Sequence, residues 1–95
     1  MKSDELFSAI RDLAVRTNAN VGEANWYLFG STQERLSDAA DIDLLVICQT
    51  NDMADAVRRA VDVDELARPI HLSILTQAEE VEIRFVKRQG CIQVV

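Results

Sequence analysis

The stretch "DIDLLVIC", residues 41–48, constrains the fold of this chain more than any other. Every residue after Asp43 in this stretch is apolar, which is typical of a strand buried on both faces inside a sheet. Asp41 and Asp43 stand at the head of that strand. Residues two apart in a strand face the same side, so their carboxylates are expected to lie together. Such like charges repel unless a cation bridges them, and the pair therefore predicts a metal site.

An alternative interpretation of these aspartates needs no metal. Asp41 then marks a polar entry into the strand, and Asp43 is a group at the strand end that neighbouring residues satisfy. An Asp-x-Asp pair is common, so the pair alone does not decide between the two interpretations.

The remaining apolar spacing predicts one small α/β domain over residues 1–95, with the order α-β-α-β-α-β-α-β. A mixed β-sheet with helices packed against it is the expected architecture. The expected elements are a helix from Ser3 that fades within 17–22, a strand over 25–29, a short helix or loop over 31–40, the strand 41–48, a helix from Asn51, a strand over 68–75, a last long helix, and a strand over 91–95.

The two later helices carry more detailed expectations. Thr76 and Glu79 match a capping box at the start of the last long helix, which is expected to end at Gly90. That helix is expected to bury Val81 and Phe85. The helix from Asn51 is expected to turn four residues toward the core: Met53, Val57, Ala60 and Val61.

Composition narrows the class of protein. A hydrophobic fraction of 48% supports a real core, and a net charge of −6 disfavours non-specific binding to nucleic acid or to an anionic membrane. No apolar run approaches the roughly 20 residues of a membrane span. The two cysteines, Cys48 and Cys91, lack metal-ligand spacing and are expected to be free thiols in a cytoplasmic protein.

Gly30 and Ser31 add a second candidate element. They lie where the strand 25–29 ends and a helix can begin. Glycine lets the backbone approach a ligand closely, and a helix N-terminus presents free N–H groups to an anion. A plain helix start is the alternative, since Ser31 and Glu34 also fit a capping box. Gly-Ser followed by Asp-x-Asp on the next strand predicts an anion cradle beside a metal pair.

The sequence "LFGS", nine residues, and then "DIDLLVI" resembles the signature of the nucleotidyltransferase superfamily, in particular its minimal nucleotidyltransferases. The resemblance spans essentially the whole chain and implies the nucleotidyltransferase fold. It implies that Gly30 and Ser31 hold nucleotide phosphates. It also implies that Asp41 and Asp43 bind Mg²⁺, or Mn²⁺, and so align an acceptor hydroxyl with the α-phosphate of a nucleoside triphosphate.

The chain departs from this family pattern at two positions. The family usually carries a third carboxylate on the next strand, where this chain has His71. That histidine is either a hydrogen-bonded polar residue or a replacement that binds metal or phosphate. Three positions after the serine, where relatives often have a basic residue, stands Glu34, and Arg35 follows it as a possible site member.

Two functions remain open on this basis. The first is a Mg²⁺-dependent nucleotidyltransferase that uses ATP and modifies a separate acceptor, since 95 residues leave no room for a domain that selects one. By resemblance, its partner is a small helical HEPN-type protein, and the chain is the antitoxin of a toxin–antitoxin pair. The second is a catalytically degraded module of the same fold that neutralises or scaffolds a partner protein.

Overall fold

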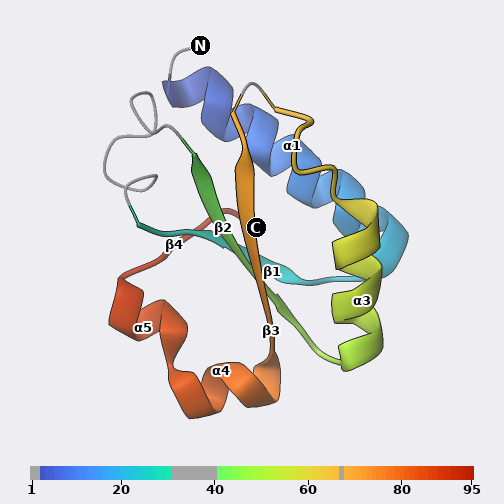
Figure 1. Ribbon diagram of the computed structural model, residues 1–95, viewed down its shortest axis with the longest axis vertical. Coiled ribbons are helices and arrows are strands. Elements are labelled where there is room, and N and C mark those ends of the chain that lie inside the picture. The colour runs from blue at the N-terminus through green and yellow to red at the C-terminus, as the bar shows by residue number, and fades with distance from the viewer. Residues whose placement is uncertain (1–2, 31–40, 67) are drawn as a thin grey trace.

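The computed structural model of the chain describes residues 3–30, 41–66 and 68–95 (Figure 1). The described part is a small mixed α/β domain built on a four-stranded sheet. Its elements are α1 (Ser3–Val21), β1 (Asn25–Leu28), β2 (Ile42–Cys48), α3 (Asn51–Ala60), β3 (Ile70–Thr76), α4 (Gln77–Ile83), α5 (Phe85–Gln89) and β4 (Ile92–Gln93). The predicted order is confirmed for these elements except that two helices, α4 and α5, stand where one was expected. The stretch 31–40, expected to be a short helix or loop, lies outside the described residues.

The sheet has the strand order β3-β2-β1-β4 and is mixed. β2 runs antiparallel to β1 and parallel to β3, while β4 pairs antiparallel with β1. β2 is therefore an inner strand, and its residues from Leu44 to Cys48 are all buried. This confirms the prediction that the apolar run is covered on both faces. The register between β2 and β3 sets Asp43 directly opposite His71.

The helices lie on both faces of the sheet (Figure 1). One face carries α1 and α3, whose apolar side chains form the main core with alternate residues of β2, such as Ile42 and Leu44. The opposite face carries α4 and α5. On α3, Met53, Val57 and Val61 contact or join the core as expected. Ala60 is exposed, contrary to expectation, because the apolar stripe of this helix runs through Ala54 instead.

Asn18 explains why α1 continues through the turn-rich stretch where it was expected to fade. Its side-chain oxygen accepts hydrogen bonds from the Trp26 indole Nε1 at 2.8 Å and from the Ala24 backbone N–H at 3.3 Å. Its side-chain nitrogen donates to the Ala24 carbonyl at 2.9 Å. These bonds join the end of α1 to the start of β1. The helix then ends at Val21, and the N–H of the following Gly22 donates to the Asn18 carbonyl.

The last helix is not continuous, which corrects the sequence prediction. Arg84 adopts φ 57°, ψ 44° and separates α4 from α5. The reason lies in Glu80, whose carboxylate accepts hydrogen bonds from the backbone N–H groups of Phe85 and Val86 and so caps a new helix start. Val81, expected to be buried, is 74% exposed.

Most other expectations for this region are confirmed. Thr76 and Glu79 form a reciprocal capping box at the start of α4, and α5 ends at Gly90 in a left-handed conformation. Phe85, expected to be buried, is only partly buried. Both cysteines are free thiols, with Cys48 buried and Cys91 partly buried. Among the described residues, no helix is both long enough and apolar enough to cross a membrane.

Replacing Asn18 by alanine tests the junction between α1 and β1. The change leaves the indole N–H of Trp26, whose side chain is fully buried, without its acceptor. We expect the free energy of unfolding to fall by about 2 kcal/mol, measured by urea denaturation. Fluorescence of Trp26, the single tryptophan, follows the transition. Asn20→Ala, an exposed position on the same helix, is the control, and an equal loss in both variants would contradict this role.

Candidate functional site

Asp41 and Asp43 lie at the N-terminal end of β2 and point to the same side of the sheet. Ile42 between them is fully buried in the core beneath α1, so the two aspartates face the opposite surface, as strand alternation predicts. The Asp41 side chain is 43% exposed and that of Asp43 is 21% exposed. The pair therefore stands at a solvent-accessible edge of the face that carries α4 and α5.

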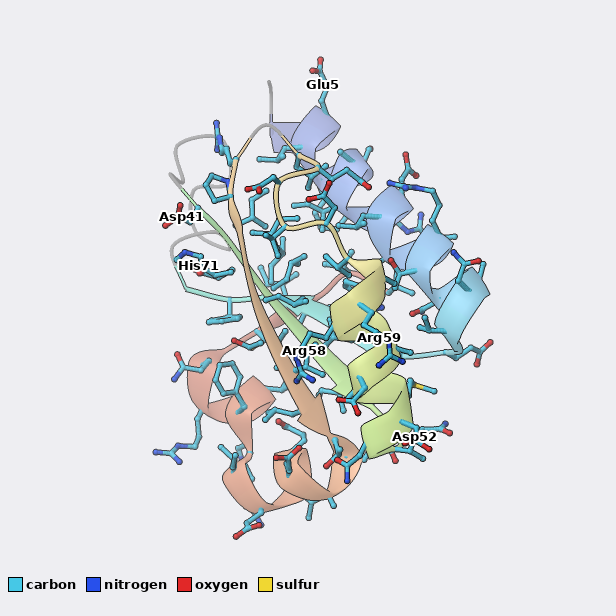
Figure 2. The ribbon with its side chains drawn as sticks, turned by 45° about the vertical axis from the view of Figure 1, so that its right-hand side comes forward. Glu5, Asp41, Asp52, Arg58, Arg59 and His71 are labelled. Atoms are coloured by element: carbon cyan, nitrogen blue, oxygen red, sulfur yellow. The ribbon has the colours of Figure 1, made fainter. Side chains whose placement is uncertain are left out.

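His71 completes this group from the neighbouring strand (Figure 2). Its Nε2 lies 3.5 Å from Oδ2 of Asp41, and its Nδ1 lies 3.5 Å from Oδ1 of Asp43. The parallel register of β2 and β3 produces this arrangement because it sets His71 opposite Asp43. The side chain of His71 is 63% exposed. The structure thus brings together Asp41, Asp43 and His71, which the sequence analysis assigned to one candidate site.

The imidazole ring acts as an internal partner for both carboxylates. A protonated ring carries an N–H donor on each nitrogen, and each donor would face one carboxylate; a neutral ring carries only one. Contacts at 3.5 Å between exposed groups add little stability on their own. Their consequence is positional, because the ring lies beside both carboxylates where a cation bridging them would also have to fit.

The donor set fits Mg²⁺ only in part. Among the described residues, no group of three or more His, Cys, Asp or Glu side chains is arranged to hold a metal ion. Mg²⁺, however, is usually held by one or two carboxylates together with water and substrate phosphates. Asp41 and Asp43 therefore suit a Mg²⁺ ion that arrives with a phosphate ligand better than a Mg²⁺ ion alone.

Gly30 lies against Asp43, and both its backbone conformation and the lack of space for a Cβ favour glycine at this position. Its φ of +65° is in the left-handed region, and a Cβ at this position would lie 2.7 Å from Oδ2 of Asp43. The preceding residue, Phe29, donates its backbone N–H to the Asp43 carbonyl at 3.2 Å. The glycine thus permits the strand end and the carboxylate to approach each other. This places Gly30 beside the aspartates, as the motif predicts.

Three residues of the predicted site lie outside the described residues. They are Ser31, expected to bind phosphate, and Glu34 and Arg35, the two residues at and after the position where the nucleotidyltransferase pattern often has a basic side chain. Their predicted roles stay predictions.

An aromatic pair beside the aspartates was missed by the sequence analysis. Phe29 and Phe85 pack edge to face, with ring centroids 5.0 Å apart and planes at 88°. Phe29 follows Tyr27 by two residues, so strand alternation sets both on the face of Asp43 and could have predicted the position of Phe29. On the same face, burial and the nearby charge of Glu80 raise the pKa of Tyr27. The pair ties α5 to the strand end that leads into Gly30.

Comparison with known proteins adds no family assignment. No model of a known protein family matches the chain, and no curated protein matches it.

Replacing Gly30 by alanine tests whether the glycine shapes the carboxylate pair. The new Cβ must displace the Asp43 carboxylate, and a non-glycine residue at this φ costs about 1–2 kcal/mol of stability. We expect a loss of that size together with shifted imidazole NMR signals of His71, the single histidine of the chain.

Gly22→Ala provides the matched control. Gly22 also has positive φ, +113°, and a Cβ there would lie 2.9 Å from Cε of Met53, on the α1 and α3 side of the sheet. This variant should lose stability while the His71 signals stay unchanged. Unchanged His71 signals in Gly30→Ala would contradict the role assigned to Gly30.

Proposed function

We propose that this chain is a minimal nucleotidyltransferase that binds a Mg²⁺–nucleoside triphosphate complex, with ATP as the first candidate, and transfers the nucleotide to an acceptor hydroxyl. One observation carries the proposal. Asp41 and Asp43 lie on one accessible face within reach of His71 on the neighbouring strand, and Asp43 lies against the backbone of Gly30. This arrangement supports a metal pair beside the glycine of the Gly-Ser motif.

The proposed roles follow the chemistry of each group. Asp41 and Asp43 hold Mg²⁺, which neutralises charge on the phosphates and favours attack of the acceptor hydroxyl on the α-phosphate, with pyrophosphate as leaving group. The backbone at Gly30, with Ser31, holds phosphate oxygens. His71 lies beside both carboxylates and, when protonated, can donate a hydrogen bond to a phosphate oxygen.

The acceptor belongs to the same proposal. The family resemblance suggests a small helical HEPN-type partner, with this chain as the antitoxin that adenylylates it. Incubation of this chain and such a partner with labelled ATP and Mg²⁺ tests the transfer step directly. Transfer of label to the partner supports it, whereas absence of label from protein, RNA and small acceptors contradicts it.

A second candidate function is a degraded module that keeps the fold and binds a partner without catalysis. The observation that favours it is the position of His71, which contacts both carboxylates where relatives have a third acid. The lack of a three-ligand metal group among the described side chains points the same way. Nucleotide binding separates the two functions.

Thermal unfolding with Mg²⁺ alone, ATP alone and both together tests nucleotide binding. Because ligands that bind the native state raise its stability, we expect Mg²⁺ and ATP together to raise the melting temperature more than either alone. Asp43→Asn should remove this gain and leave the fold intact. Asp52→Asn is the control, since this exposed carboxylate on α3 lies far from Asp41 (Figure 2). No response of the wild type to Mg²⁺–ATP would favour the binding module.

His71→Asp tests the missing third acid. Since the His71 ring faces both aspartates, a carboxylate at this position would join two others and lower the stability of the metal-free protein. With Mg²⁺ bound, His71→Asp should be more stable than the wild type. The added negative charge near a divalent ion strengthens its binding by about 1 kcal/mol or more at moderate dielectric. Calorimetric titration with Mg²⁺–ATP measures the gain. His71→Asn, which removes the ring without adding charge, should show no such gain.

A further inference from the structure

Among the described residues, β3 lies at one edge of the sheet and pairs only with β2. In the strand order β3-β2-β1-β4 it is the longest edge strand, with seven residues, Ile70–Thr76. Its sequence, IHLSILT, contains no Lys, Arg, Asp, Glu or Pro. Natural proteins usually protect a free edge with charges, prolines, bulges or very short strands. An uncharged edge of this length is one that another strand can extend.

The hydrogen bonds at β3 show which of its backbone groups point outward. Ile42 donates its N–H to the Pro69 carbonyl, and Ile42 is in register with Ile70. In a parallel ladder, this sets the backbone groups of His71 and of every second residue after it toward β2. The N–H and C=O groups of Ile70, Leu72, Ile74 and Thr76 therefore point away from the sheet.

The two ends of this outward row are already satisfied within the chain. The N–H of Ile70 donates to the Val63 carbonyl at 3.0 Å, and the N–H of Thr76 donates to Oε1 of Glu79 at 2.9 Å. Among the described residues, the outward N–H and C=O groups of Leu72 and Ile74 make no hydrogen bond. The free part of the edge is thus a window of two residues on either side of Ser73, and no helix or strand is drawn in front of it in Figure 1.

We propose that a second copy of this chain pairs with this window, so that two sheets join antiparallel through β3 about a two-fold axis at Ser73. The argument for a second copy is self-complementarity. In this register, Leu72 pairs with the partner's Ile74 and Ile74 with the partner's Leu72, which satisfies the outward N–H and C=O groups of both residues. Any other self-pairing register would need the N–H of Ile70 or of Thr76, and both are already engaged.

Side chains along the edge agree with this pairing. Leu72 and Ile74 are partly exposed, and they become direct cross-strand neighbours on the face that carries the main core. The strand brings no acidic side chain to the axis, although the chain has a net charge of −6. The Glu79 carboxylate, which accepts from the outward N–H of Thr76, lies at the end of the window and not at the axis. This inference does not depend on the proposed nucleotide site.

Proline at Ile74 tests the pairing by sedimentation over a range of protein concentrations. The Ile74 N–H points outward, so Ile74→Pro removes an edge donor without removing a hydrogen bond to β2. We expect the wild type to form dimers and Ile74→Pro to weaken dimerisation by about tenfold or more. Gln77→Pro is the matched control. It lies at the first position of α4, where proline is well tolerated, and should leave dimerisation unchanged.

A cysteine at Ser73 provides a test that does not depend on the fold tolerating proline. Ser73 would face the partner's Ser73 at a non-hydrogen-bonded position, where Cα atoms lie about 4.5 Å apart, within the range of a disulfide. Under oxidising conditions, Ser73→Cys should give a covalent dimer, in a Cys91→Ser background to remove the partly exposed native thiol. Asn20→Cys, on the exposed side of α1, should not.

A dimer that Ile74→Pro weakens, or that Ser73→Cys cross-links selectively, supports the proposal. A wild type that stays monomeric at all concentrations overturns it and assigns the edge to a strand of another protein. A dimer that responds to neither variant also overturns it, because the contact then lies elsewhere on the surface.

Discussion

Burial of β2 is the constraint on which the rest of the domain depends. The strand is paired along both edges and its residues from Leu44 to Cys48 are buried on both faces, so each neighbouring element is placed relative to it. Its parallel register with β3 sets His71 opposite Asp43, and its antiparallel pairing with β1 brings Gly30 to the same place. The hydrophobic effect that holds this strand therefore also sets the geometry of the polar group at its end.

The two carboxylates repel each other, and the His71 ring beside them occupies space that a metal ion would need. These like charges stand at the mouth of a buried strand, and the His71 ring lies 3.5 Å from each of the two carboxylates. The same ring competes for the space and the charge that a metal ion would use. Under the proposed function, phosphate oxygens of the nucleotide would complete the coordination of a Mg²⁺ ion held by two carboxylates.

Local patterns predicted much of this fold, and contacts between distant residues explain what they missed. Periodicity was enough for the strands, and the pairing of Thr76 with Glu79 was enough for the start of α4. The break at Arg84 depends on the Glu80 carboxylate, which accepts a hydrogen bond from the Phe85 N–H. The extension of α1 depends on a hydrogen bond that the Trp26 indole N–H donates to the Asn18 side-chain oxygen. Neither interaction leaves a periodic signal in the sequence. The placement of the aspartates followed from alternation, whereas their contact with His71 also needed the strand register.

The helical layer formed by α4 and α5 is attached to the sheet more weakly than the layer on the other face. Neither helix has a fully buried residue, and the strand that follows them, β4, has only two residues. Segments with so little buried surface open at a lower free energy than the core, so this layer should exchange its amide hydrogens sooner than α1 or β2. Because Phe85 holds Phe29 directly before Gly30, each such opening would loosen one wall of the carboxylate site while the core stays folded.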